Sequence, residues 1–116
     1  MRHRKKQIIL DRKRAPRIAL IRSLVRAFII HGKIDTTDAR GRAVRSVTER
    51  LITLAKDQSL HHRRMIIQRT GSVDVANRII EKIAPRYKER HGGYTRRYKI
   101  NSRQGDRASM VRIELI

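Results

Sequence analysis

The stretch YTRRYKINSRQGDRASMVRIEL, residues 94–115, decides the fold class because its apolar period differs from that of the residues before it. In residues 110–115, MVRIEL, apolar and polar side chains alternate, and this alternation predicts a β-strand. Residues 94–100, YTRRYKI, alternate in the same way. The polar residues and the glycine of 101–107, NSRQGDR, are typical of a hairpin loop. We therefore expect two antiparallel strands here.

The residues before this stretch predict four helices, because their apolar side chains recur every three or four residues. The second helix begins at Thr37 or Asp38, and Gly41 is the residue that fits it least. Four helices packed with a small C-terminal β-hairpin give an α+β fold, to which Lys33–Thr37 could add a third strand. The expected core residues are Ile18, Ile21, Leu24, Val25, Phe28, Ala43, Val44, Val47, Leu51, Leu54, Ala55, Leu60, Ile66, Ile67, Val75, Ala76, Ile79, Ile80 and Ile83.

Proline, glycine and serine residues mark the expected ends of the other helices. The first helix is expected to start near Pro16, and Gly32 is its stop signal. The hydroxyl groups of Ser59 and Ser72 can cap the third and fourth helices. Pro85 is expected to close the fourth helix or to turn the chain.

The charge of the chain is extreme for its size. Its 116 residues include 30 lysines and arginines but only 10 acidic residues, so the formal net charge is +20. A free domain of this size usually carries a charge of about 2–8. Twenty-two of the cations are arginine, whose planar guanidinium holds phosphate with two hydrogen bonds. We therefore expect a polyanionic partner, and nucleic acid in particular.

The positive charge is densest at the N-terminal end. Residues 1–14, MRHRKKQIILDRKR, hold seven cations and one acid, Asp11. Such a block is expected to stay unfolded until it meets a polyanion, although a solvated tail without a specific partner is the alternative. We expect residues 1–14 to form a basic RNA-binding extension and residues 15–116 to form a single α+β domain.

Several functional classes are excluded or disfavoured. The chain has no cysteine, which excludes disulfides, zinc fingers and thiol chemistry. No run approaches the roughly 18 apolar residues that span a bilayer. The basic start is followed by only three apolar residues, 8–10, where a secretory signal needs about 7–15. We expect a cytoplasmic protein with no membrane and no small-molecule substrate.

Catalytic chemistry has little support in the sequence. Asp35 and Asp38 are close enough in sequence to be considered as a pair of metal ligands. The simpler interpretation is that one carboxylate lies at the end of a strand and the other at the start of a helix. His61 and His62 are adjacent, so on a helix they diverge by about 100° and share a metal poorly. No glycine-rich phosphate loop is present. We expect no cofactor, no metal and no enzymatic activity.

The spread of the cations favours RNA over DNA. Sequence-specific DNA readers usually present one recognition helix, whereas these cations occupy every predicted element. Only four aromatic residues occur, so recognition should rest on phosphate, ribose and RNA shape. A nucleoid or regulatory DNA-binding protein and an RNA-processing enzyme are the alternatives. The candidate RNA contacts are Arg2, His3, Arg4, Lys5, Lys6, Arg12, Lys13, Arg14, Arg40, Arg42, Arg45, Arg63, Arg64, Arg96, Arg97 and Arg103.

Five short motifs resemble one family in order and spacing: MRHRK at 1–5, IDTT at 34–37, LITLAK at 51–56, HGGYTR at 91–96, and QGD at 104–106 followed by IEL at 113–115. Together they resemble the bacterial ribosomal large-subunit protein seventeen family over almost the whole chain. The chain departs from the family pattern at 7–14, QIILDRKR, and at 40–42, RGR, where it keeps or raises the positive charge.

This resemblance implies a structural constituent of the bacterial large ribosomal subunit. It further implies binding to the large rRNA near the peptide exit tunnel and contact with neighbouring ribosomal proteins, including protein thirty-two of the same subunit.

Overall fold

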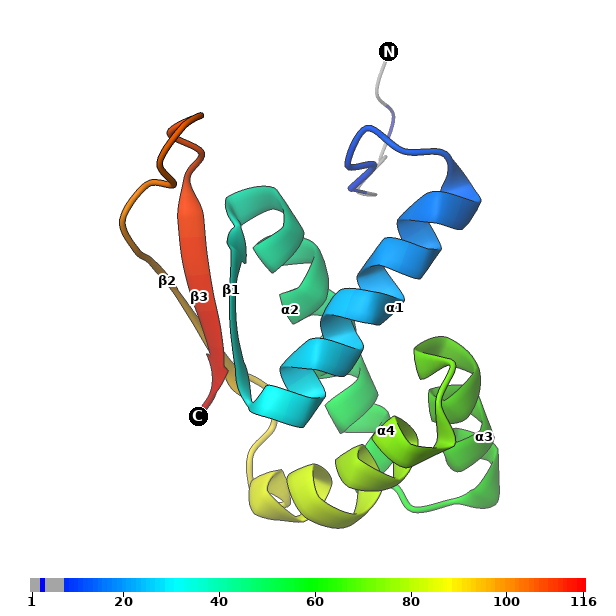
Figure 1. Ribbon diagram of the computed structural model, residues 1–116. Coiled ribbons are helices and arrows are strands. Elements are labelled where there is room, and N and C mark those ends of the chain that lie inside the picture. The colour runs from blue at the N-terminus through cyan, green and yellow to red at the C-terminus, as the bar shows by residue number, and fades with distance from the viewer. Residues whose placement is uncertain (1–2, 4–7) are drawn as a thin grey trace.

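The α+β fold predicted from the sequence is confirmed (Figure 1). The computed structural model describes residue 3 and residues 8–116, so the expected unfolding of the basic extension at residues 1–2 and 4–7 lies outside the described part. The helix α2 and the end of α1 lie against one face of a small sheet, and α3 and α4 pack on the far side of α2. The elements are α1 (Arg14–His31), β1 (Lys33–Thr37), α2 (Asp38–Lys56), α3 (Leu60–Thr70), α4 (Val73–Arg78) continued by η1 (Ile79–Ile83) and η2 (Ala84–Tyr87), β2 (Thr95–Lys99) and β3 (Met110–Leu115).

The sheet has three antiparallel strands in the order β1-β3-β2, which confirms both the C-terminal hairpin and the third strand at Lys33–Thr37. The central strand, β3, pairs Ile113 with Ile34 on one side and with Arg97 on the other. Val111 and Ile113 are buried against the helices, as the alternation predicts. No helix of the described residues covers the opposite face of the sheet (Figure 1).

The hydrophobic core lies around α2, which packs between the sheet and the other helices (Figure 1). Most of the expected core residues are confirmed, including Phe28 and Ile79, which are fully buried. The fully buried Ile29 and Ile52 were not among the expected core residues. The buried faces of α1 and α2 are therefore slightly rotated from the predicted ones. Val47, Leu54 and several others are only partly buried, and Ile18, Leu60 and Ile30 reach solvent.

The glycine that fits α2 least marks the place where the helix crosses the sheet. Gly41 is buried, and a Cβ atom at this position would lie 2.6 Å from Val111 Cγ2. Real Cβ atoms do not approach that closely, so any larger residue must push α2 away from β3. The helix therefore keeps a residue of low helix propensity because the packing requires it.

Two helix ends differ from the prediction. The first helix begins at Arg14, two residues before Pro16. The fourth does not close at Pro85, because the chain continues through a π-helical turn and a 3-10 turn to Tyr87. Proline cannot donate a backbone hydrogen bond, and its ring would clash with the carbonyl four residues earlier. The wider turn, in which the N–H of Ala84 donates to Ile79 O, accommodates Pro85 within a helical path.

The predicted serine caps and glycine stop signals are confirmed. Ser59 Oγ accepts the N–H of His62 at 3.1 Å, and Ser72 Oγ accepts the N–H of Val75 at 3.4 Å. Gly32 follows α1 with a φ of 78°, in the left-handed region where glycine carries no Cβ penalty.

Replacement of Gly41 by valine tests the close crossing of α2 and β3. Gly41→Val should lower the free energy of unfolding by about 1–3 kcal/mol, because the new side chain overlaps Val111. Ala39→Val is the matched control, since Ala39 lies in the same turn of α2 but is exposed, and it should cost only about 0.5 kcal/mol. Urea unfolding of both variants measures the difference, and equal losses would contradict the crossing.

Candidate nucleic-acid interface

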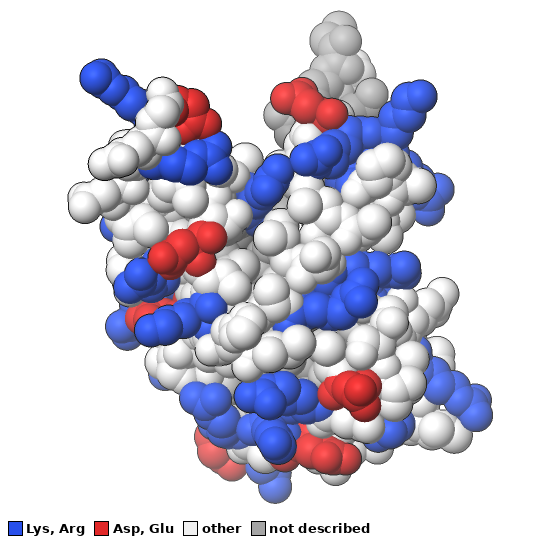
Figure 2. All heavy atoms as spheres, viewed as in Figure 1, with Lys and Arg blue, Asp and Glu red and all other residues white. Residues whose placement is uncertain are grey.

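Most of the positive charge has no partner within the fold. Of the 30 lysines and arginines, 26 lie in the described residues. Six of these, all arginines, have a carboxylate within 4.0 Å, which leaves 20 described cations without one among the described residues. Figure 2 shows the basic side chains spread over the face in view, from the start of α1 to the lower helices, rather than gathered at one spot.

The face of the sheet that points away from the helices is charge-compensated. The guanidinium of Arg112 on β3 donates two hydrogen bonds to Asp35 on β1, at 2.7 and 3.0 Å. These bonds hold the pKa of the Asp35 carboxyl below its ordinary value. Arg96 on β2 lies 3.8 Å from Glu114, its cross-strand neighbour on β3. Cross-strand ion pairs therefore neutralise most of this face.

The inner side of β2 is tied to α2 by polar contacts. Arg97 donates to Asp38, the first residue of α2, and Asp38 also lies 3.0 Å from Arg42. Thr95, which is buried, donates its hydroxyl proton to Glu49 at 2.8 Å. Arg97 thus faces the helix and links it to the edge of the sheet. Its neighbour Arg96 points to the opposite side, as successive strand residues must.

The loop between β2 and β3 is held by its own ion pair. Arg103 donates to both carboxylate oxygens of Asp106, at 2.6 and 3.2 Å. The hydrogen bond from Arg103 is the main cause that lowers the pKa of Asp106 to about 2. Asp106 also accepts the N–H of Ala108 at 3.1 Å, which closes the turn. One of the predicted RNA contacts, Arg103, therefore also shapes this loop.

Five of the 20 described cations without a carboxylate lie at or near two helix N-termini. Arg12, Lys13 and Arg14 are exposed at the start of α1, which has no acidic residue in its first turn. Arg63 and Arg64 lie in the first turns of α3, which also begins without an acidic residue. Helix N-termini carry partial positive charge, so cations there are unfavourable by about 0.3–1 kcal/mol each. An anion bound at these ends would remove that cost.

The predicted RNA contacts do not converge on one patch. Of the sixteen, Arg2, Arg4, Lys5 and Lys6 lie outside the described residues, and His3 is exposed. The other eleven are distributed over α1, α2, α3, β2 and the loop before β3. Five of them have carboxylate partners: Arg42, Arg45, Arg96, Arg97 and Arg103. The rest have none among the described residues: Arg12, Lys13, Arg14, Arg40, Arg63 and Arg64.

A basic hollow between α2 and α3 was missed in the sequence. It has a volume of about 520 Å³, and its lining holds two arginines, Arg50 and Arg69, and one acid, Glu49, together with Ser46, Thr53, Leu54, Gly92 and Tyr94. Arg69 belongs to the end of α3, which Arg22 of α1 holds by donating to the carbonyls of Gln68 and Arg69. No sequence spacing brings α2 and α3 residues together, so only the packing of the helices could reveal this site.

The residues considered for catalysis have structural partners. Asp35 and Asp38 are both bound by arginines, and His62 Nδ1 lies 3.1 Å from Asp57. Within the described part of the chain, no group of three or more histidine and acidic side chains could hold a metal ion. None of the described helices is both long and apolar enough to cross a bilayer.

Comparison with known proteins identifies the family. The family model described as ribosomal protein L17 matches residues 20–116. The chain belongs to the ribosomal protein L17 family. It is 47% identical over 107 residues to the large ribosomal subunit protein bL17 of Clostridium botulinum strain Hall, covering 92% of this chain and 95% of that protein. The bL17 protein of Clostridium perfringens strain SM101 is 45% identical with the same coverage.

Membership of the L17 family confirms the resemblance read from the five motifs. The chain is a structural, non-enzymatic protein of the large ribosomal subunit, so the predicted absence of enzymatic activity is confirmed by the family. The predicted location, in the bacterial large ribosomal subunit of the cytoplasm, is confirmed in the same way.

Single alanine substitutions separate the two arginines of β2. Arg97→Ala should lower the free energy of unfolding by about 1 kcal/mol, because it removes the half-buried ion pair with Asp38. Arg96→Ala should change it by less than about 0.5 kcal/mol, because Arg96 is exposed and its carboxylate lies 3.8 Å away. Thermal or urea unfolding compares the two variants, and an equal loss would show that Arg97 does not anchor α2.

Proposed function

We propose that the chain binds large-subunit rRNA through lysine and arginine contacts to phosphate. The observation that carries this proposal is the set of 20 described cations without a carboxylate within 4.0 Å. Their mutual repulsion disfavours the folded state, and bound phosphates remove that repulsion. Because the unpaired cations lie on all four helices, the RNA should contact the helical side of the molecule from several directions.

The N-terminus of α1 is proposed as one of the phosphate sites. It combines the partial positive charge of a helix end with Arg12, Lys13 and Arg14, which have no acidic partner among the described residues. Backbone N–H groups at a helix start point outward and donate to phosphate oxygens. Arg64 of α3, which also has no acidic partner among the described residues, is proposed as a further phosphate contact.

The hollow lined by Arg50 and Arg69 favours RNA over DNA. Two guanidinium groups can hold phosphate, while the hydroxyl group of Ser46 can bond to a ribose 2′-hydroxyl. Base stacking has little support, because Phe28, Tyr87 and Tyr94 are buried and Tyr98 alone among the aromatic rings is exposed. Backbone contacts and RNA shape should therefore carry recognition.

The remaining predicted RNA contacts differ in whether a carboxylate lies near the cation. Arg40, Arg12, Lys13 and Arg14 have no carboxylate within 4.0 Å among the described residues, whereas Arg42, Arg45, Arg96, Arg97 and Arg103 must share their charge with carboxylates. We propose that residues 1–14 form the RNA-binding extension of a single domain formed by residues 15–116. From the family resemblance we also propose a place near the peptide exit tunnel and contact with protein thirty-two.

Salt dependence tests whether phosphate contacts dominate. If 6–10 phosphates are neutralised, affinity for large-subunit rRNA should fall by about a thousandfold or more between 50 and 200 mM salt. Filter binding at several salt concentrations measures the slope, and duplex DNA at matched salt is the control. A nearly flat slope would contradict the proposal, and tighter binding to DNA would favour the alternative of a DNA-binding protein.

Deletion of the extension tests its role separately. Removal of residues 2–13 deletes six cations and one acid and leaves the start of α1 intact. The melting temperature should stay the same or rise slightly, because repulsion is relieved. The salt slope should shrink by about 2–3 if half of the deleted cations contact phosphate. An unchanged slope would show that the extension does not bind RNA, and a collapsed melting curve would show that it belongs to the fold.

A further inference from the structure

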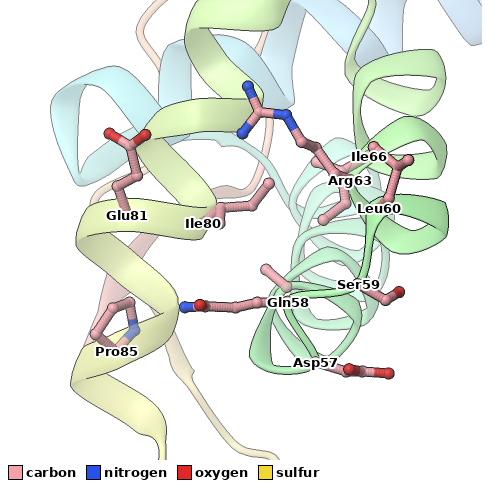
Figure 3. A pocket seen from close by; sticks show the side chains of 10 residues that line it. Asp57, Gln58, Ser59, Leu60, Arg63, Ile66, Ile80, Glu81 and Pro85 are labelled. Carbon is pink, nitrogen blue, oxygen red and sulfur yellow. The ribbon is translucent and has the colours of Figure 1, made fainter.

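A groove of about 550 Å³ lies between the start of α3 and the η1–η2 segment (Figure 3). Half of its lining is apolar and comes from α2, α3, η1 and η2, with Ile66 and Ile80 among the lining residues. Leu60, at the first position of α3, also lines the groove and exposes 61% of its surface. An exposed leucine next to an apolar groove is the kind of surface that another apolar side chain can cover.

The charge of this groove has the opposite sign from that of the chain. Its charged lining residues are Asp57, Glu81 and Arg63, so two acids stand against one cation in a chain of net charge +20. Among the described residues, no lysine or arginine lies within 4.0 Å of Glu81, and the partner of Asp57 is His62. Figure 3 shows Glu81 and Asp57 at opposite ends of the groove. The carboxylates repel phosphate and attract cationic side chains.

The groove is continued by a second hollow, which suits an extended peptide. The side chain of Gln58 reaches across it toward Pro85 (Figure 3). A second hollow of about 380 Å³ is also lined by Asp57, Gln58 and Pro85, so the two hollows adjoin at these residues, and Lys56 and Lys88 complete the charged lining of the second one. The amide of Gln58 has both donors and an acceptor and can bond to a peptide backbone that passes it.

We propose that this groove is the docking site of an extended protein segment that carries an apolar side chain beside a lysine or arginine. The apolar side chain enters between Leu60 and Ile80, and the cation pairs with Glu81. The inference rests on the proposed function, because it requires the chain to sit among other basic proteins within an RNA–protein particle. RNA is the less suitable occupant, because the lining holds two carboxylates and no aromatic ring.

Site-directed crosslinking tests the occupant. The chain has no cysteine, so a single substitution fixes the attachment point. The cysteine of Leu60→Cys is labelled with a photoreactive maleimide, and purified large subunits that contain the labelled chain are irradiated. Mass spectrometry identifies peptide adducts, and primer extension identifies rRNA adducts. Val73→Cys is the control, because Val73 is exposed at the start of α4 and does not line the groove. If Leu60→Cys does not assemble, Gln58→Cys replaces it.

The expected Leu60→Cys adduct is one defined peptide with an apolar residue next to lysine or arginine, which Val73→Cys does not capture. Adducts to rRNA alone, no adduct, or the same peptide from both positions would overturn the inference. A parent chain that fails to enter large subunits would instead overturn the proposed function.

A charge reversal provides the second readout. In the Leu60→Cys background, Glu81→Lys should reduce the yield of the peptide adduct about fivefold, because a cation then faces the cation of the partner. Glu89→Lys makes the same change in charge at an exposed residue that does not line the groove, and it should leave the yield unchanged. Equal yields from the two variants would overturn the proposed pairing.

Discussion

Repulsion among 30 cations is the constraint to which the rest of the structure responds. Five carboxylates on α2, the strands and the β2–β3 loop hold six arginines, and three of these six pairs join elements of the sheet to each other or to α2. The charge on the outer face of the sheet is thereby largely balanced, while the helices retain their excess. The molecule thus has a compensated side, which the fold stabilises by itself, and an uncompensated side, which rRNA is proposed to stabilise.

The α2 helix connects these two sides. Gly41, which has no side chain, lets α2 approach β3 closely. Asp38, at the first position of α2, accepts a hydrogen bond from Arg97 of the edge strand β2. The helix packs against α1, α3 and η1, and its end leads into the groove proposed to bind a neighbouring protein. The same helix therefore positions the sheet, the core and two candidate interaction surfaces, which explains why its sequence keeps a glycine at a helical position.

Periodicity and composition predict the elements of this fold but not how the elements meet. The alternation at 110–115 and the serine caps depend on neighbouring residues, so the sequence reveals them directly. The pairing of Arg97 with Asp38 joins residues 59 positions apart, and the hollow at Arg50 and Arg69 needs two packed helices. Sequence reasoning therefore identified the basic character of the site, whereas the separation of paired from unpaired arginines required the structure.

The most direct test compares two triple variants that lose the same charge. Arg63→Gln, Arg64→Gln and Arg69→Gln remove cations without carboxylate partners, whereas Arg42→Gln, Arg103→Gln and Arg112→Gln remove paired ones. The slope of log affinity against log salt for large-subunit rRNA is measured for both. The account predicts that the slope shrinks by about 2–3 for the first variant and by less than about 1 for the second. Equal reductions would contradict the claim that unpaired cations carry the binding.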